Sequence, residues 1–306
     1  MLVFQAQYQS GIRLSIADFT DPEAAVIPYG HLQLVKVVRQ EPVSTSDEKK
    51  PIAAGDPVTI KQISIHAGGI EADGNLLFVV DTHVGIRIFD LNNLFTADSS
   101  IDDRIGTSAD GKLVAFSHRY VIPEIGVYQF DHGDPFSSIS LQSSEQETGS
   151  DKVFITSQYV TKWELSPSPL VHGFHFINGA FTSAKPDRYW PADTPSPTLK
   201  LKRPVYYSQG AMRINGVIWS TITGQTDYKN STARLVRTKS VDLNNLSEPN
   251  GSATRFRWPH GSEDLYYERA TDMLWSLTEH PRSSKLLEKC QDRVVFGVEL
   301  STYDDL

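Results

Sequence analysis

Short apolar runs separated by polar turns dominate the chain. The runs, each about five to eight residues long and rich in Val, Ile, Phe, Tyr and Trp, alternate with clusters of Gly, Asp, Asn and Pro. Residues 74–81 followed by 85–90 are an example. This spacing is typical of β-strands joined by tight turns. Helical periodicity is weak, and its best window, residues 283–290, is short. The pattern therefore predicts an all-β fold.

The strand types recur in a fixed order along the chain. Residues 66–90, 208–237 and 261–299 each contain a strand of small residues, a polar turn, an apolar strand with a polar end, and a third strand. Weaker copies occupy residues 137–165 and 2–36, and the latter looks like a unit whose innermost strand is missing. Such repetition predicts a β-propeller of about five blades, since a sandwich would not explain the recurring order.

The repeats also bear on the domain organisation. A length of 306 residues suggests about two domains. The repeats instead predict a single domain, residues 1–306, with an incomplete N-terminal blade and long surface loops at 41–57 and 184–204. The loop at 184–204 is either a lid over one face or simply an exposed surface loop. A sixth blade around residues 172–178 stays open at this point.

Composition narrows the function classes. The chain carries 37 acidic and 29 basic residues, a formal net charge of −8, and no basic cluster of the kind that nucleic-acid binding requires. Its single cysteine excludes an internal disulfide framework and a Cys-only zinc site. There is no apolar run of about 18 residues, so we expect no membrane span. The N-terminus lacks the features of a secretory signal, which predicts a cytoplasmic protein, or a secreted one if the N-terminus is truncated.

Propeller geometry brings polar residues to one rim. Neighbouring strands in a blade are antiparallel, so the start of the inner strand and the end of the second strand lie at the same end of the blade. We expect four catalytic residues on this rim: His66, Asp81, Glu263 and Asp264. We expect the following residues to bind substrate: His83, Tyr159, Trp190, Tyr207, Gln209, Glu279 and His280.

Each candidate also has a structural interpretation. His66 is either an acid or base that titrates near neutral pH or a cap on a backbone group. Asp81, at a strand end, is equally suited to a local turn bond. Adjacent strand residues point to opposite faces. Of Glu263 and Asp264, we therefore expect one side chain to enter the channel and the other to bond to the neighbouring blade. The chain has no G-x-S-x-G, P-loop or H-E-x-x-H motif, and we expect neither a cofactor nor a metal.

Two stretches resemble a known family. His66-Ala-Gly-Gly through Asp90, and Gly261-Ser-Glu-Asp-Leu265 with Leu274 through Pro281, resemble a family of poorly characterised β-propeller proteins. Members occur as predicted secreted proteins of filamentous bacteria and as fungal pathway proteins. The fungal branch includes the propeller of the trichothecene toxin cluster, which is associated with ring closure of a sesquiterpenoid. The resemblance covers roughly residues 1–300 and implies a propeller fold and a role in fungal secondary metabolism.

The leading hypothesis is a cofactor-independent cyclase or isomerase acting on a small, mostly apolar natural product by general acid–base catalysis. Two alternatives belong to other classes. One is a non-catalytic propeller that binds a protein or glycan through exposed aromatic and Arg residues. The other is a metal-dependent, lactonase-like hydrolase with Ca²⁺ at the channel centre. Propellers host many unrelated functions, so the sequence leaves these alternatives open.

Overall fold

The computed structural model describes most of the chain in two compact units. It covers residues 2–4, 11–18, 21, 26–40, 51–101, 103–130, 135–142, 152–158, 171–182, 187–190, 206–224, 233–239, 241–242, 254–259, 262–278 and 294–303. Unit 1 comprises Met1–Asp81 and Gly85–Gln129, and unit 2 comprises Thr82–Val84 and Phe130–Leu306. The two units are described separately below.

Unit 1 consists of strands. They are β1 (Leu2–Phe4), β2 (Ile12–Ala17), β3 (Tyr29–Arg39), β4 (Val58–Gln62), β5 (Ala67–Asp73), β6 (Leu76–Asp81), β7 (Gly85–Asp90), β8 (Phe95–Thr96), β9 (Ile105–Thr107), β10 (Leu113–Ala115) and β11 (Tyr120–Gln129).

Two blades share one sheet in unit 1. The strand order is β1-β2-β3-β11-β7-β6-β5. Outside this order, β4 pairs with β3, and β8 pairs with β11. The β3–β11 pair is parallel, whereas β1–β2–β3 and β5–β6–β7–β11 are antiparallel. Alternation sets the faces: Ile12 and Leu14 of β2 are buried in an apolar cluster with Leu34 and Phe89, while Arg13 and Ser15 point away from it.

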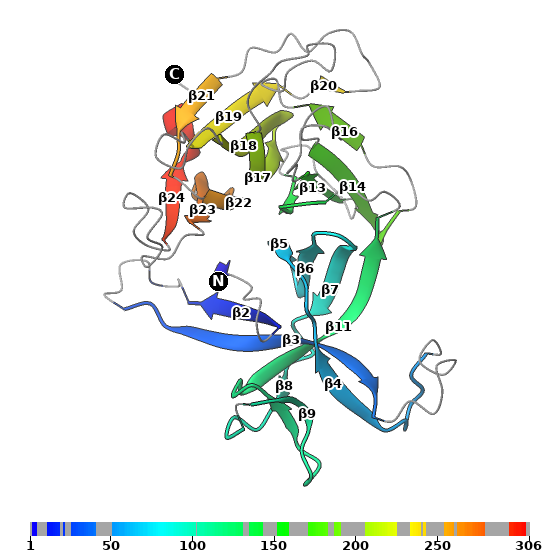
Figure 1. Ribbon diagram of the computed structural model, residues 1–306. Helices are drawn as coiled ribbons and strands as arrows, with labels where there is room; N and C mark the ends of the chain where they lie inside the picture. Colours follow the sequence, from blue (N-terminus) through cyan, green and yellow to red (C-terminus); the bar gives the residue numbers. More distant parts are fainter. Residues whose placement is uncertain are drawn as a thin grey trace. The chain divides into compact units, whose positions relative to one another are not determined.

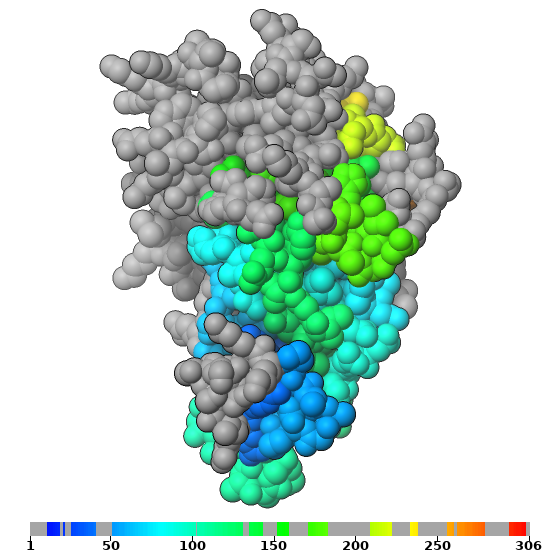
Figure 2. All heavy atoms as spheres, turned by 90° about the vertical axis from the view of Figure 1, so that its right-hand side faces the viewer, coloured from blue at the N-terminus to red at the C-terminus, as the bar shows by residue number. Residues whose placement is uncertain are grey.

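The long strands β3 and β11 extend into a second, smaller core. There β4, β8 and the β9–β10 hairpin surround Val35, Ile60, Ala115 and Val121 (Figure 1). The Thr107 hydroxyl donates to Thr59 Oγ1 at 2.8 Å and ties the hairpin to β4. Figure 2 shows the surface of this part at the lower end of the molecule, where the blue and blue-green spheres lie together.

Unit 2 contains the remaining strands and a short 3-10 helix. They are β12 (Ser140–Leu141), β13 (Lys152–Ser157), β14 (Val171–Ile177), β15 (Ala180–Phe181), β16 (Asp187–Trp190), β17 (Tyr206–Ile214), β18 (Val217–Gly224), β19 (Ala233–Lys239), β20 (Val241–Asp242), β21 (Thr254–Arg257), β22 (Ser262–Glu268), β23 (Met273–Thr278), β24 (Val295–Glu299) and η1 (Leu300–Tyr303).

Three antiparallel blades follow one another in unit 2. Their strand orders are β12-β13-β14-β16-β20, β17-β18-β19-β21 and β22-β23-β24 (Figure 1). An aromatic core joins the last two blades, where Trp219, Phe256 and Trp258 pack with Phe296 and Tyr303. The C-terminal helix η1 thus contributes to the core between these sheets.

The sequence correctly predicted the blade-built, all-β fold. The five repeat units correspond to five antiparallel blades, two in unit 1 and three in unit 2. One strand assignment was wrong. The third strand of this blade is β14, Val171–Ile177, which pairs with β13. The predicted copy at 137–165 instead ended with a strand at 161–165, and that segment lies outside the described residues. The region considered for a sixth blade is therefore the third strand of the third blade. That all blades form one domain stays a prediction.

Candidate functional site

The inner strands of three blades carry a bulge near their start. The register shifts between Ala67 and Ile70 in β5, between Ser208 and Gly210 in β17, and between Glu263 and Tyr266 in β22. A bulge leaves extra residues unpaired, turns their side chains away from the regular alternation, and is frequent beside active sites. The bulged residues include Gln209 and Asp264, which the sequence had singled out.

The β22 bulge holds Glu263 and Asp264 in a defined geometry. Asp264 has a φ of 41°, in the left-handed region that few residues other than glycine adopt. The Ser276 hydroxyl of β23 lies 2.8 Å from the Glu263 carbonyl oxygen and 2.9 Å from that of Asp264, so it donates to this pair of carbonyls. The Leu265 amide donates to Asp264 Oδ1 at 3.0 Å. Because of the bulge, the two acidic residues do not follow the strict alternation expected from the sequence.

The β17 bulge packs directly against the β22 bulge. A Cβ atom at Gly210 would lie 2.9 Å from the Asp264 carbonyl carbon and 2.9 Å from Thr221 Oγ1. This close approach requires glycine. The half-buried Gln209 directly precedes this contact in β17. We call Gln209, Gly210, Glu263, Asp264 and Ser276 the bulge site.

A buried hydroxyl recurs on the second strand of each blade in unit 2. Ser157, Thr221 and Ser276 lie opposite the irregular start of their inner strands and are at most 5% exposed. Ser157 and Ser276 hydrogen-bond to inner-strand groups, the former to Ser138 Oγ at 2.7 Å. Thr221 Oγ1 has no hydrogen-bond partner among the described residues. In the sequence, each of these three hydroxyls is a Ser or Thr inside an otherwise apolar strand. The predictions from the sequence did not use this signal.

In unit 1, Asp81 lies in a buried ion-pair network. Arg87 of β7 donates from Nη2 to Asp81 Oδ2 at 2.7 Å, and from Nε to the same oxygen at 3.0 Å. Arg87 Nη1 forms a second ion pair with Glu124 of β11. Burial opposes the charge on Arg87, but the hydrogen bonds that Arg87 donates to the carboxylates of Glu124 and Asp81 outweigh it and raise the pKa of Arg87 above its usual value. The network joins three strands, and the sequence analysis missed both Arg87 and Glu124.

The other predicted residues fall into two groups. His66 is exposed and precedes Ala67, whose register partner is Asp81, so His66 and Asp81 lie at the same end of their blade as predicted. His83 is exposed in the turn between β6 and β7. Three residues lie outside the described part of the chain, namely Tyr159, Glu279 and His280. For Trp190 in β16 and Tyr207 in β17, the structure describes the backbone but not the side chain.

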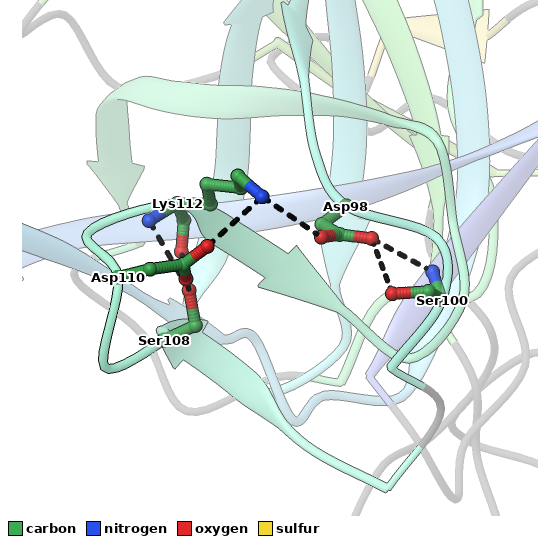
Figure 3. A network of polar contacts seen from close by, with 5 residues as sticks. All are labelled: Asp98, Ser100, Ser108, Asp110 and Lys112. Carbon is green, nitrogen blue, oxygen red and sulfur yellow. Dashed lines mark hydrogen bonds and ion pairs between the residues drawn. The ribbon is translucent and has the colours of Figure 1, made fainter.

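Two further acidic residues of unit 1, Asp98 and Asp110, form a separate network with Lys112. Lys112 Nζ contacts Asp110 Oδ2 at 2.9 Å and Asp98 Oδ2 at 3.8 Å at the β9–β10 turn (Figure 3). Hydrogen bonds from Ser108 and Lys112 lower the pKa of Asp110 to about 2. All of these groups are solvated and stabilise a local turn.

Neither a metal cluster nor a membrane helix is found in the part of the chain that the structure describes. Among those residues, no three His, Cys, Asp or Glu side chains gather closely enough to hold one metal ion. Within the same residues, no helix is long and apolar enough to cross a membrane.

Comparison with known proteins finds matches among solved structures but none among family models or curated proteins. The resemblance to the propeller family therefore stays an expectation. Among solved structures, the α-L-arabinofuranosidase from Lactobacillus brevis matches 97% of this chain and 91% of its own, with 10% identity and a TM-score of 0.38. A likeness at this level carries no argument about the substrate of this chain.

Proposed function

We propose that this protein is a cofactor-independent cyclase or isomerase that uses the bulge site for general acid–base catalysis. The observation that carries the proposal is the β22 bulge, which takes Glu263 and Asp264 out of the regular strand register and holds the Asp264 backbone against Gly210 of β17. Two adjacent carboxyl groups provide an acid and a base when they carry one proton between them. The substrate class we propose is a hydroxylated, mostly apolar natural product of the sesquiterpenoid type.

The proposed step is an intramolecular ring closure with loss of water. One carboxyl group protonates a leaving hydroxyl while the neighbouring carboxylate accepts the proton of the attacking hydroxyl. A carbon–oxygen bond forms to the attacking oxygen, the bond to the leaving oxygen breaks, and water departs. The proton balance is neutral, because one group loses the proton that the other gains.

The remaining predicted residues take supporting roles in this proposal. Gln209 is suited to orient a substrate hydroxyl, because its amide offers both a donor and an acceptor beside the bulge. His66 is a further proton-transfer candidate. Asp81 is assigned to hold Arg87 rather than to transfer protons, because its Oδ2 already accepts two hydrogen bonds. Tyr159, Trp190 and Tyr207 are proposed to line the apolar part of the substrate site, where aromatic faces stabilise positive charge.

The experiment is turnover of hydroxylated sesquiterpenoids, followed by mass spectrometry for products that have lost one water. Glu263→Gln and Asp264→Asn should each lower kcat by about 10²–10⁴-fold. Glu268→Gln is the matched control, because it removes a carboxylate from the same strand but outside the bulge, where Glu268 Oε2 accepts from the Thr271 hydroxyl at 2.8 Å. Unchanged turnover in both bulge variants would refute the assignment.

Two outcomes would favour the alternative functions. Tight binding of the compounds with no product in the wild-type protein would support a non-catalytic module. Turnover that a chelator abolishes and Ca²⁺ restores would support the metal-dependent hydrolase.

A further inference from the structure

A serine and a histidine form a hydrogen-bonded pair on the outward face of unit 1. Ser15 of β2 and His31 of β3 are direct register partners, and Ser15 Oγ lies 2.8 Å from His31 Nδ1. Both side chains lie on the face opposite the apolar cluster that contains Leu14 and Leu32. The imidazole is exposed. In the tautomer with its proton on Nε2, His31 accepts the Ser15 hydroxyl proton at Nδ1.

The surroundings of His31 favour the neutral imidazole. Burial lowers the pKa of His31 below its usual 6.5, and the nearby positive charges of Arg13 and His118 lower it further. The Tyr29 ring meets the imidazole edge-on with 5.3 Å between the centroids. Among the described residues, these three are the charged or titratable groups that face His31. A neutral imidazole is the form that can act as a base.

Arg13 supplies a cation on the same face. It stands two residues before Ser15 in β2, so both side chains lie on one side of the strand. Its Nε is buried and has no hydrogen-bond partner among the described residues. Within the same residues, the Arg13 guanidinium forms no ion pair with a carboxylate. A buried donor of this kind is costly unless it meets an acceptor, and an oxyanion beside Ser15 is a suitable one.

We propose that Ser15, His31 and Arg13 form an acyl-transfer site for carboxylic esters, separate from the bulge site. Ser15 Oγ bonds to the ester carbonyl carbon as its proton passes to His31 Nδ1, and the carbonyl oxygen becomes an oxyanion that Arg13 binds. The carbon–oxygen bond to the alcohol then breaks, and the departing alkoxide takes the proton from His31. Water hydrolyses the acyl-Ser15 by the same route, with His31 again accepting and returning the proton.

The test combines covalent labelling with ester hydrolysis on the full chain. A fluorophosphonate probe, followed by peptide mass spectrometry, should label Ser15, and p-nitrophenyl acetate should be hydrolysed at a rate that rises with pH through an inflection below pH 6.5. Ser15→Ala should abolish both signals. His31→Gln should slow labelling by about 10²-fold and remove the inflection from the pH profile. Arg13→Gln should move the inflection to higher pH, because a positive charge that lowers the pKa of His31 is gone.

The controls separate this site from general reactivity. Ser64→Ala removes another exposed serine of unit 1, one that accepts a hydrogen bond from Gln62 at 2.9 Å, and should change neither signal. Ser15→Thr keeps the hydroxyl and checks that any loss in Ser15→Ala is chemical. Labelling of Ser15 that proceeds at the wild-type rate in His31→Gln, or labelling spread over several serines, would overturn the proposal. Neither result depends on the bulge site, because Ser15, His31 and Arg13 belong to unit 1 and the bulge site belongs to unit 2.

Discussion

Replacing Arg87 by methionine should destabilise unit 1 strongly. The Asp81, Arg87 and Glu124 side chains are only 5%, 14% and 8% exposed, so the network is largely shielded from water. One cation compensates two carboxylates there, and Arg87→Met leaves two buried negative charges without a partner. Removing one member of a buried ion pair costs about 3–5 kcal/mol. We therefore expect a loss of this size in the free energy of unfolding of unit 1.

A triple replacement separates loss of charge pairing from loss of packing. Arg87→Met combined with Asp81→Asn and Glu124→Gln leaves no buried charge, and such neutral replacements are often close to neutral in stability. We expect the triple variant to recover most of the loss. Arg39→Met is the matched control, because its ion pair with Asp56 is more exposed, at 20% and 30%. Its expected cost is below about 1 kcal/mol.

The assay must report on the unit that is perturbed. All five tryptophans lie in unit 2, so tryptophan fluorescence follows that unit. Hydrogen exchange of β6 and β7 peptides in increasing urea follows unit 1. With a urea dependence of about 2 kcal/mol per molar, the transition of these peptides should move down by roughly 1.5–2.5 M in Arg87→Met. A shift no larger than that of Arg39→Met, or a triple variant as unstable as the single one, would refute the reasoning.

Three further predictions concern single sites. Gly85→Ala should destabilise unit 1 by on the order of 3 kcal/mol in the same exchange assay, because its Cβ would lie 1.8 Å from the Tyr128 carbonyl oxygen at a φ of +152°. Gly210→Ala should shift the β22 bulge and lower turnover together with stability, by about 1–3 kcal/mol in fluorescence-detected unfolding; an unchanged bulge in a crystal structure of the variant would contradict this. Burial works to raise the pKa of Asp272, but hydrogen bonds from the Ser301 amide and the Tyr267 hydroxyl lower it below 3.8. Asp272→Ala should therefore lower the stability at neutral pH, and its difference from wild type should shrink as pH falls below about 3.8 in pH-dependent unfolding; a difference that grows in acid would contradict the expected sign.

The sequence was most informative where local chemistry repeats. Each apolar second strand, such as 76–81 or 217–224, is marked by its β-branched and aromatic residues and by the turns around it. The antiparallel rule also located the ends of these strands correctly, since Ala67 pairs with Asp81 and Ser262 with Thr278. The third strand of the third blade was misplaced, because two apolar segments compete there and periodicity does not choose a pairing partner.

Position along the strands alone singled out Glu263, Asp264 and Gln209. The structure places them in the bulges of β17 and β22, which pack against each other at Gly210 and Asp264. Their environment was not predictable, because the Ser276 hydroxyl and the glycine contact depend on register and on the neighbouring blade. The pairing of Asp81 with Arg87 was missed for the same reason, as a strand-end Asp gives no sign of which cation it meets.

The sequence by itself determined the strand content, the blade repeats and the polar ends of the strands, because these depend on residues close together in the chain. Only the tertiary structure decided that Asp81 pairs with Arg87 and that Glu263 and Asp264 lie at a bulge. It alone also placed Ser15 against His31, 16 positions apart. Such contacts follow from strand register and blade packing, which no local pattern specifies.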